Sequence, residues 1–444
     1  MTIARTICLG FLTVILIGTI LLTLPISTSA GMWNNPIVAL FTATSAVCVT
    51  GLIVVDTGTH FSFLGELFIL LLIQIGGLGY MTTTTFLVSL VRRKFDLRQK
   101  VAIQESFDRP FLLGSQNLIK SVIATTLIFE IMGILLLVRP FINEYGFNQG
   151  LWVAIFHTIS AWNNAGFSLF SDSLTRYQGI WFINSVICAL IIFGGIGYQV
   201  IIEMYLWFAS KFFWQRRFTV SLNFKVVLST TLVLLALGTV AFLFTEYSNP
   251  NTLHNLPLPQ KILAAWFQSV TTRTAGFNTL DFGKMNDATL FIALGLMAIG
   301  ASPSGTGGGI KTTTIRILIN CTRSTLQGNE QVLMYSRKIP NSLILKAIAV
   351  VFGSGMMMII ITTLLSIIET GNFDFLDLFF EVISAFATVG LSTGITADLS
   401  AFGQLILIFT MFVGRVGILV FIAAIYGDPH PTQIQYPEEN LLVG

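Results

Sequence analysis

Charged residues are scarce in this chain of 444 amino acids. Asp, Glu, Lys and Arg together make up 10% of it, whereas a soluble domain carries roughly 25%. Hydrophobic residues make up 54%, and the mean hydropathy is +0.81, so lipid rather than water must cover most of the apolar surface. This composition excludes a soluble enzyme and a disordered chain. The net charge is only +3, with basic residues in short patches between apolar runs, which also excludes a nucleic-acid binder.

Cysteine and histidine are also rare, with four of each. Neither type shows the close spacing that a disulfide framework or a transition-metal site needs. We therefore expect the cysteines to be small apolar helix residues and the histidines to be structural or solvated; they are Cys8, Cys48, Cys188, Cys321, His60, His157, His254 and His430. An intramembrane protease or lipid transferase would need catalytic side chains that converge on one site. The sequence shows no such set, so we expect no enzymatic activity.

Eight runs of the sequence are apolar enough to cross a bilayer, which takes about 20 residues. They lie near residues 5–25, 62–91, 116–138, 180–210, 222–245, 289–320, 342–366 and 401–426. The connections on the side of the termini carry 18 Lys and Arg residues against five on the other side, so the positive-inside rule predicts that both termini are cytoplasmic. The opposite face is acidic and includes Asp56, Asp172 and Asp281. Such a face would concentrate cations, although a merely solvated face fits the charges equally well.

Each pair of spans is joined by a segment that is too apolar for an exposed loop and too short for two more crossings. The four segments resemble one another and read TATSAVCVTGL (42–52), HTISAWNNAGFS (157–168), QSVTTRTAGFNT (268–279) and EVISAFATVGLST (381–393). Their glycines, at positions 51, 166, 276 and 390, are 115, 110 and 114 residues apart, which indicates a fourfold internal repeat. Because each unit contains two crossings, successive units start on the same side of the membrane. The repeats are therefore parallel rather than inverted.

Helix-starting signals precede each glycine. They are Asn35 before Pro36, Asn148 before Leu151, Pro259 before Lys261, and Asp374 before Phe375. Each opens a helix of about 11–15 residues, roughly 17–22 Å long, which reaches only partway across a hydrocarbon core of about 30 Å. Non-helical backbone at that depth is tolerated only where protein buries it or water bathes it. Four such helix ends that meet on one axis would form a pore.

The predicted fold is an all-α integral membrane protein. It has eight transmembrane helices in four parallel M1-P-M2 repeats, where P is a re-entrant pore helix, arranged around a pseudo-fourfold central pore. The predicted units are residues 1–95, 96–211, 212–322 and 323–426, followed by a short cytoplasmic tail at 427–444.

Glycine at the end of each short helix lets the chain turn its carbonyl groups toward the axis, because glycine tolerates positive φ and has no Cβ. The four helix C-termini, each equivalent to about half a negative charge, would favour a dehydrated monovalent cation. A ring of carbonyl oxygens can replace the hydration shell of potassium, as in potassium channels. The alternative, that each glycine only permits tight helix packing, is disfavoured by the regular spacing. Arg273 lies too close to Gly276 to enter such a filter without blocking it, so we expect it to brace the loop from behind.

The sixth span contains a break. It is helical in character to about Ile299 and then reads GASPSGTGGGIKTTT (300–314), which cannot sustain an ordinary helix. A phosphate-binding loop does not fit, since Ile310 rather than glycine precedes Lys311. We expect a flexible loop that lines a cavity; a simple packed kink is the alternative. In the last span, Arg415 lies far from either end and should face the bundle interior, where its role is either in the ion path or in a structural pair.

These glycine segments, together with IGGLGYMTTTT (75–85) and FGGIGYQVIIE (193–203), resemble the Trk/Ktr/HKT superfamily of potassium transporters. The resemblance covers nearly the whole chain, and the length and short termini are most similar to KtrB-type membrane subunits of bacterial Ktr systems. It implies a potassium-binding filter at Val49, Thr50, Gly51, Asn164, Ala165, Gly166, Thr274, Ala275, Gly276, Thr388, Val389 and Gly390. It also supports a gate below the filter, formed by Arg415 and the intramembrane loop, with Lys311 a weaker candidate; the loop glycines are Gly300, Gly305, Gly307, Gly308 and Gly309.

The resemblance has further implications for the ion and the partners. In the family a serine at the first filter position accompanies sodium transport and a glycine accompanies potassium transport, so Gly51 implies potassium uptake. The resemblance separately implies that uptake depends on sodium as a second ion. A homodimer in the lipid of the bacterial cytoplasmic membrane is implied, with a cytosolic RCK-type nucleotide-binding regulatory ring (KtrA type) on its basic face. No organic cofactor is implied. Because each segment keeps only one glycine of the TVGYG pattern, we expect weaker selectivity over sodium than in a TVGYG pore. A secondary transporter of another cation or an organic solute is the alternative.

Overall fold

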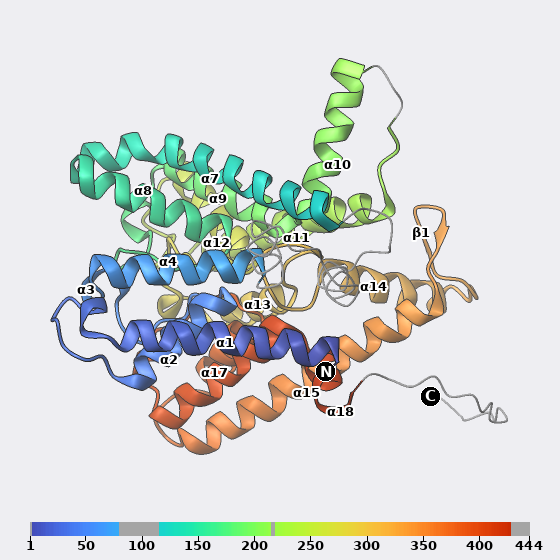
Figure 1. The fold of residues 1–444 in the computed structure, drawn as a ribbon. Coiled ribbons are helices and arrows are strands. Elements are labelled where there is room, and N and C mark those ends of the chain that lie inside the picture. Colours follow the sequence, from blue (N-terminus) through green and yellow to red (C-terminus); the bar gives the residue numbers. More distant parts are fainter. Residues whose placement is uncertain (1, 80–114, 215–217, 428–444) are drawn as a thin grey trace.

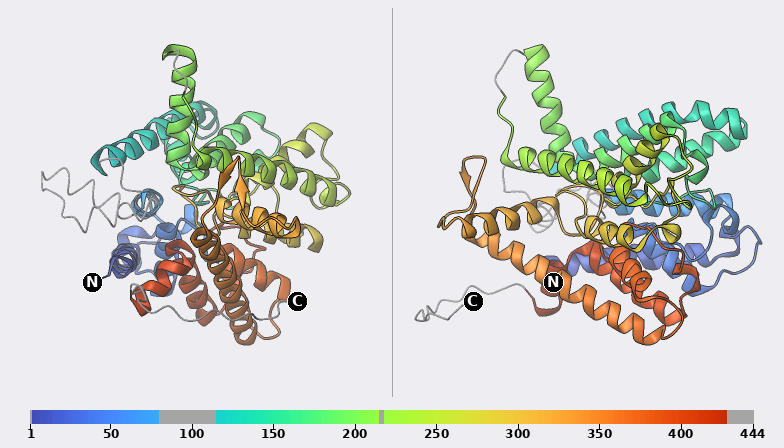
Figure 2. Two further views of the ribbon diagram at one scale, coloured as in Figure 1. Left: turned by 90° about the vertical axis from the view of Figure 1, so that its right-hand side faces the viewer. Right: turned by 180° about the vertical axis from the view of Figure 1, so that it is seen from behind.

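The computed structural model describes residues 2–79, 115–214 and 218–427. The basic residues between 92 and 109, the boundary predicted between residues 95 and 96, the 80–85 part of the first glycine motif and the tail from 428 onward lie outside these ranges. Within them the chain is mostly helical. The long helices run side by side along one direction, with shorter helices between them (Figures 1 and 2).

A long helix, a short helix and a second helix follow one another four times along the chain. The long helices are α1 (Ile3–Thr23), α7 (Ser115–Tyr145), α11 (Leu222–Glu246) and α15 (Asn341–Ile368). The short helices are α2 (Pro36–Cys48), α8 (Phe147–Trp162), α12 (Leu258–Thr271) and α16 (Phe375–Phe386). The second helices are α4 (Phe63–Leu78), α9 (Trp181–Ile196), α13 (Asp287–Ala298) and α17 (Ala401–Val416). This order confirms the predicted helix–pore helix–helix architecture.

Further elements continue or connect these units. Helices α10 (Tyr198–Ala209), α14 (Thr312–Leu326) and α18 (Ile418–Tyr426) follow the second helices of the last three units. A small hairpin, in which β1 (Leu333–Met334) pairs antiparallel with β2 (Arg337–Lys338), separates α14 from α15. The remaining short turns are η1 (Pro25–Ser27), α3 (Thr57–His60), η2 (Thr175–Tyr177), η3 (Ser210–Trp214), η4 (Phe282–Lys284) and η5 (Thr396–Asp398).

Helix length and composition fit a multi-pass membrane protein. Four helices in the described part of the chain, α1, α7, α11 and α15, are long and apolar enough to cross a membrane, and the bent pairs α9–α10 and α17–α18 raise the number to six. Helices α4 and α13 are apolar but shorter, and they occupy the same place in their units as α9 and α17.

The spans predicted near 180–210 and 401–426 are bent, and the part of the 62–91 span beyond Gly79 lies outside the described residues. Helix α4 ends before Gly79, and the chain turns by 103° between α9 and α10 and by 96° between α17 and α18. Gly79 at the end of α4 and the bend residues Gly197 and Gly417 have φ values of +77°, +97° and +89°. A residue with positive φ ends an α-helix, and glycine adopts that conformation without steric cost. Hydropathy predicts how far an apolar run extends but not this change of direction.

The starts of the short helices agree with the sequence at two places out of four. Asn35 caps α2, where its side chain accepts a hydrogen bond from Ile37 N at 2.9 Å, and Asp374 precedes α16. The other two helices begin one or two residues before the predicted signals. Helix α8 begins directly after Gly146, whose φ of +77° allows an immediate turn out of α7. Helix α12 begins after Pro257, so Pro259 lies in the first turn, where a missing N–H is not needed.

Each short helix also packs against the second helix of a neighbouring unit. Helix α8 packs against α4, α12 against α9, α16 against α13, and α2 against α17. The last contact joins the first unit to the fourth, so the series closes on itself. The left view of Figure 2, along the helices, shows the first unit (blue) beside the last (red).

Candidate functional site

Four glycines lie in a closed ring at the ends of the short helices. Each glycine lies next to a carbonyl oxygen of the following segment. That oxygen belongs to the residue just before the glycine of that segment. A Cβ atom on Gly166 would lie 2.8 Å from Ala275 O, and one on Gly276 would lie 2.7 Å from Val389 O. A Cβ on Gly51 would likewise meet Ala165 O, and one on Gly390 would meet Thr50 O. The last contact runs from the fourth segment back to the first, so the four segments surround one centre.

Four non-glycine residues beside this ring have a strained backbone. Val49, Asn164, Thr274 and Thr388 have φ values of +56°, +57°, +66° and +51°, and each lies two residues before its glycine. A left-handed conformation costs a residue with a Cβ about 1–2 kcal/mol, and it persists only where the surrounding structure holds it. The same strain at the same position in four segments indicates that the surrounding structure holds the ring backbone in one conformation, as is typical of a functional site.

Hydroxyl groups on the short helices hold the ring backbone from behind. Ser45 Oγ accepts a hydrogen bond from Gly51 N at 3.0 Å and donates one to Leu52 O at 2.7 Å. Ser384 Oγ accepts from Gly390 N at 3.1 Å. Ser160 donates to Phe167 O, and Thr271 donates to Phe277 O. These residues were not among the predicted site residues, although a Ser-Ala pair recurs six residues before the glycine in three of the four segments.

A cavity of about 610 Å³ lies directly against the ring, and its lining includes Gly51, Gly166, Gly276 and Gly390. Polar side chains from the loops that lead into the second helices make up much of the remaining lining. Eleven of the twelve predicted filter residues are buried, and Gly390 is partly exposed. Their four glycines line the cavity, so the structure brings the four predicted segments together at its inner end.

The carboxylates of the cavity are paired. Asp172 and Asp281 line it, and they form ion pairs with Arg176 at 2.9 Å and with Lys284 at 3.0 Å. Burial raises the pKa of Asp172, but hydrogen bonds from Arg176 and Thr175 outweigh that effect and hold the pKa below its ordinary value. Asp56 instead caps α3, by accepting a hydrogen bond from Thr59 N at 2.9 Å. The predicted acidic face is therefore largely neutralised at the cavity itself.

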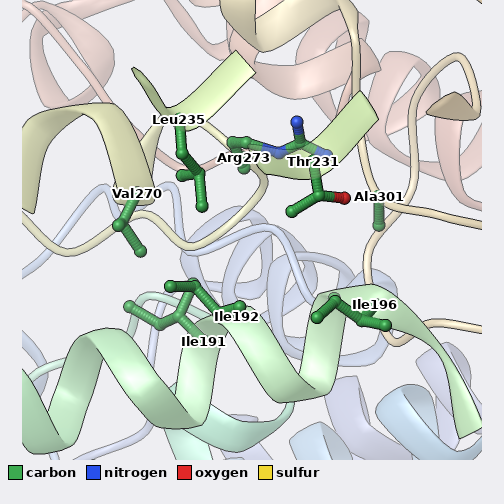
Figure 3. A pocket seen from close by; sticks show the side chains of 9 residues that line it. Ile191, Ile192, Ile196, Thr231, Leu235, Val270, Arg273 and Ala301 are labelled. Carbon is green, nitrogen blue, oxygen red and sulfur yellow. The ribbon is translucent and has the colours of Figure 1, made fainter. Parts of the chain in front are cut away.

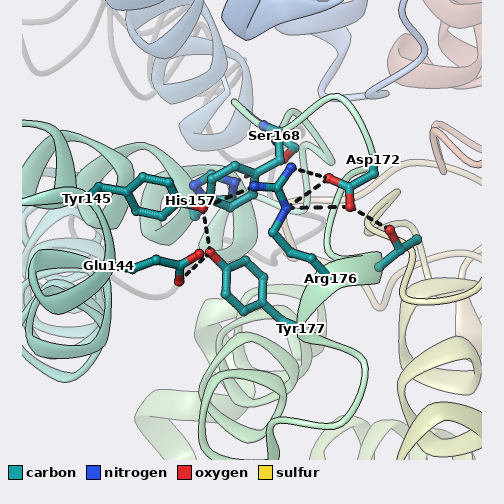
Figure 4. A network of polar contacts seen from close by, with 9 residues as sticks. Glu144, Tyr145, His157, Ser168, Asp172, Arg176 and Tyr177 are labelled. Carbon is teal, nitrogen blue, oxygen red and sulfur yellow. Dashed lines mark hydrogen bonds and ion pairs between the residues drawn. The ribbon is translucent and has the colours of Figure 1, made fainter.

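Figure 4 shows how Arg176 is held. Its guanidinium also donates to Tyr145 Oη at 3.1 Å, and Tyr145 Oη lies 2.9 Å from Tyr177 Oη. Tyr177 in turn donates to Glu144 at 2.9 Å. A buried His157 lies beside this network, with its ring nitrogens near Val153 O and Ser168 Oγ, so its role is structural, as expected. The network fixes the loop between α8 and α9 at the outer rim.

The break between α13 and α14 forms an ordered loop under the ring. Its main chain bonds to itself, through Gly300 N to Ile310 O at 3.0 Å and Ala301 N to Gly308 O at 3.2 Å. It also bonds to the end of α9, through Ser302 N to Gly195 O at 3.0 Å. Non-helical backbone within a membrane requires such partners. The loop is therefore a folded element rather than a kink.

This loop touches two of the strained ring residues. Gly308 N donates to Thr388 Oγ1 at 2.9 Å. A Cβ on Gly308 would lie 2.6 Å from the same oxygen, and a Cβ on Gly307 would meet Thr274 Oγ1. Only glycine allows the backbone to approach the ring so closely.

Arg415 joins the loop to the first unit. Its guanidinium donates to Thr306 O in the loop and to Gly76 O in the last turn of α4. Lys311 donates to Gly307 O at 2.8 Å. Arg273 lies behind the ring, as expected, and donates to Gly300 O at 3.2 Å. The predicted gate residues thus converge on one place directly beneath the ring, and no group of His, Cys, Asp and Glu side chains suited to a metal ion occurs in the described ranges.

Comparison with known proteins identifies the architecture. Residues 6–429 match the TrkH family, described as cation transport protein. The chain belongs to this family. Potassium uptake protein B of the Ktr system of Bacillus subtilis is 40% identical over 442 residues, covering 99% of this chain and 96% of that protein. The corresponding protein of Vibrio alginolyticus is 39% identical, covering 99% of this chain and 94% of that protein.

Two further comparisons extend this picture. The potassium/sodium uptake protein NtpJ of Enterococcus hirae is 35% identical, covering 98% of this chain and 96% of that protein. Among solved structures, the potassium transporter TrkH of Vibrio parahaemolyticus matches with a TM-score of 0.72 at 18% identity, covering 94% of this chain and 85% of that one. At this identity the match concerns the fold, and family membership confirms the superfamily resemblance found in the sequence.

Proposed function

We propose that this protein takes up potassium ions across the bacterial cytoplasmic membrane through the central ring. The observation that carries the proposal is the closed series of glycine-to-carbonyl approaches, in which Gly390 of the fourth segment meets Thr50 O of the first. Carbonyl oxygens around one axis replace the water that a cation loses on entering. The relatives from Bacillus subtilis and Vibrio alginolyticus are named potassium uptake proteins, which supports potassium as the ion.

The filter is formed by the main chain of the residues from the strained position to the glycine in each segment: Val49 to Gly51, Asn164 to Gly166, Thr274 to Gly276 and Thr388 to Gly390. The C-termini of the four short helices point at this region and add negative potential. The membrane potential drives ion entry, since it supplies about 2.3 kcal/mol per charge for each 100 mV.

The gate is the loop between α13 and α14, held closed by Arg415. The loop lies against the ring at Gly307 and Gly308, and a cationic guanidinium beside it repels a potassium ion. Both groups would have to move for ions to leave the filter on the inner side. The two carbonyl contacts of Arg415 stabilise the closed position and fit a gate that opens when they are broken.

Partners and a second ion complete the proposal. Two relatives carry a Ktr system name, which supports a regulatory subunit, proposed as a cytosolic nucleotide-binding ring of the RCK type bound to a homodimer of this chain. Sodium dependence is supported by the potassium/sodium name of a third relative. The termini and the basic connections face the cytoplasm in this arrangement.

Rubidium flux tests the function. The full chain is reconstituted into lipid vesicles, and uptake of labelled rubidium is followed under an imposed inside-negative potential. We expect uptake that excess potassium suppresses and that choline does not. A Gly51→Ser variant should shift the competition toward sodium. Uptake no faster than in empty vesicles, or suppression by choline as strong as by potassium, would overturn the proposal.

A further inference from the structure

A small cavity lies behind the third filter segment (Figure 3). It has a volume of about 20 Å³, and roughly 10–15 Å³ on this measure suffices for one water molecule. Its walls come from α9, α11, α12 and the intramembrane loop, and most of them are apolar: Ile191, Ile192, Gly195, Ile196, Thr231, Leu235, Val270, Arg273 and Ala301. The cavity therefore has room for a ligand of about one heavy atom, and it is too small for a carboxylate, phosphate or sulfate.

Two polar groups of this cavity have no partner. Arg273 is 8% exposed; its Nη2 donates to Gly300 O, but its Nη1 is buried and makes no hydrogen bond. Thr231, 5% exposed, also has a buried hydroxyl without a partner. Figure 3 shows both side chains reaching into the space above Ile192 and Ile196. Buried polar groups are rarely left unpaired, and such exceptions indicate a ligand or an ordered water.

Charge decides between an anion and a water molecule. The lining contains no carboxylate, and neither of the two ion pairs in the described chain involves Arg273. A carbonyl oxygen and a water molecule can accept its hydrogen bonds, but beyond the partial negative charge at the C-terminus of α12 they leave its positive charge uncompensated among isoleucine, leucine and valine side chains. A buried charge without compensation is costly, and an anion supplies both the missing acceptor and the missing charge.

We infer that this cavity binds a single halide ion, chloride in the cell, between Arg273 Nη1 and Thr231 Oγ1. Arg273 directly precedes Thr274, a strained residue of the ring, and it also holds Gly300 at the start of the loop. The halide thereby compensates a positive charge immediately behind the filter and fixes the side chain that connects the filter to the loop. This effect on ion occupancy rests on the proposed function, whereas the halide site itself does not.

Anomalous diffraction from bromide tests the site. Crystals of the full chain are grown with bromide replacing chloride. We expect an anomalous peak in the cavity, within hydrogen-bond distance of Arg273 Nη1, that is lost in Arg273→Met and weakened in Thr231→Val. Arg176→Met is the matched control, because Arg176 is paired with a carboxylate, and it should keep the peak. Absence of an anomalous peak at saturating bromide, with water density there instead, or a peak that persists in Arg273→Met, would overturn the inference.

Thermal unfolding provides a second measurement that needs no crystals. At constant ionic strength, replacing gluconate by chloride should raise the Tm of the wild-type chain and of Arg176→Met in a saturable way, because a ligand that binds only the folded state stabilises it. Arg273→Met should lose this dependence. An equal chloride dependence in Arg273→Met would overturn the inference. Since neither measurement involves transport, a chain that binds bromide but carries no rubidium would contradict the proposed function alone.

Discussion

The ring and the region beneath it differ in symmetry. In the ring, four segments place a strained residue and a glycine at the same two positions, and each glycine approaches the next segment in the same way. Beneath it the units diverge. In the second and fourth units, the second helix turns at a single glycine. In the third unit, the second helix is interrupted from Ile299 to Lys311 by a loop that lies against the ring.

This difference separates two tasks. Near-equivalent carbonyl groups suit the coordination of an ion, which requires ligands on all sides. A single loop suits closure, because it can move without changing the other three units. Arg415 adds to the asymmetry, since it is contributed by the fourth unit and bonds to the third and the first.

The largest effect should follow from breaking the ring. In Gly390→Ala the new Cβ would collide with Thr50 O. Overpacking costs about 1–3 kcal/mol and the left-handed backbone about 1–2 kcal/mol, so we expect rubidium uptake to fall roughly 100-fold, which corresponds to about 3 kcal/mol. Gly371→Ala is the matched control, because Gly371 has a similar φ of +81° but open space around it. Comparable loss in both variants would mean that backbone strain rather than the ring is responsible.

A smaller effect of opposite sign is expected at the loop. Arg415→Ala removes two charge-assisted hydrogen bonds that hold the loop. Each such bond contributes about 1.5–3 kcal/mol, so a closed state weakened by only about 1.4 kcal/mol would raise flux roughly tenfold. Arg5→Ala is the control, since Arg5 also donates to two carbonyl oxygens, of Ala424 and Ile425, but at an exposed helix end. Unchanged flux in a normally folded Arg415→Ala protein would remove Arg415 from the gate.

The same two regions differ in how well the sequence predicts them. The positions of the ring glycines follow from a local requirement, because the loop after each short helix needs a second residue with positive φ, and the matching segments mark the place. The end of α13 near Ile299 was predictable because the proline- and glycine-rich run that follows cannot sustain a helix. What could not be predicted is the contact of Gly308 with Thr388, since a side chain and a backbone amide that are 80 residues apart leave no periodic signal.

The bends of the second helices show another limit. The glycine motifs at 75–85 and 193–203, which contain Gly79 and Gly197, served only as a family signature, and hydropathy continues through both of them. A bend depends on the φ of one residue and on what the emerging chain packs against, as where Gly197 meets Pro303 O. The serines behind the ring were visible as a repeated Ser-Ala pair, but their role depends on a turn that exists only once the segment has folded.

The contact between filter and loop can be weakened without altering either backbone. Thr388→Val removes the hydroxyl that accepts from Gly308 N, and valine already occupies this position in the first segment, at Val49. A neutral hydrogen bond contributes about 0.5–1.5 kcal/mol, so rubidium flux should rise about threefold while potassium competition is unchanged. Thr158→Val is the control, because the buried hydroxyl of Thr158 has no partner. Lower flux in Thr388→Val would indicate that this contact supports the filter instead of closing the pore.

The smallest effect is expected at the outer rim of the cavity, where ion pairs with Arg176 and Lys284 neutralise the carboxylates of Asp172 and Asp281. Arg176→Gln leaves Asp172 without its ion pair and so adds one net negative charge to the wall of the cavity. Such a charge raises the local concentration of cations, and we expect rubidium uptake at low ionic strength to increase about twofold. The increase should disappear near 1 M salt, where the screening length falls to about 3 Å. Lys211→Gln, which removes an exposed charge at the other end of the bundle, should show neither effect. A gain that persists at high salt would mean that Arg176 acts by fixing the loop between α8 and α9, and that the rim, like the ring, works through its geometry rather than its charge.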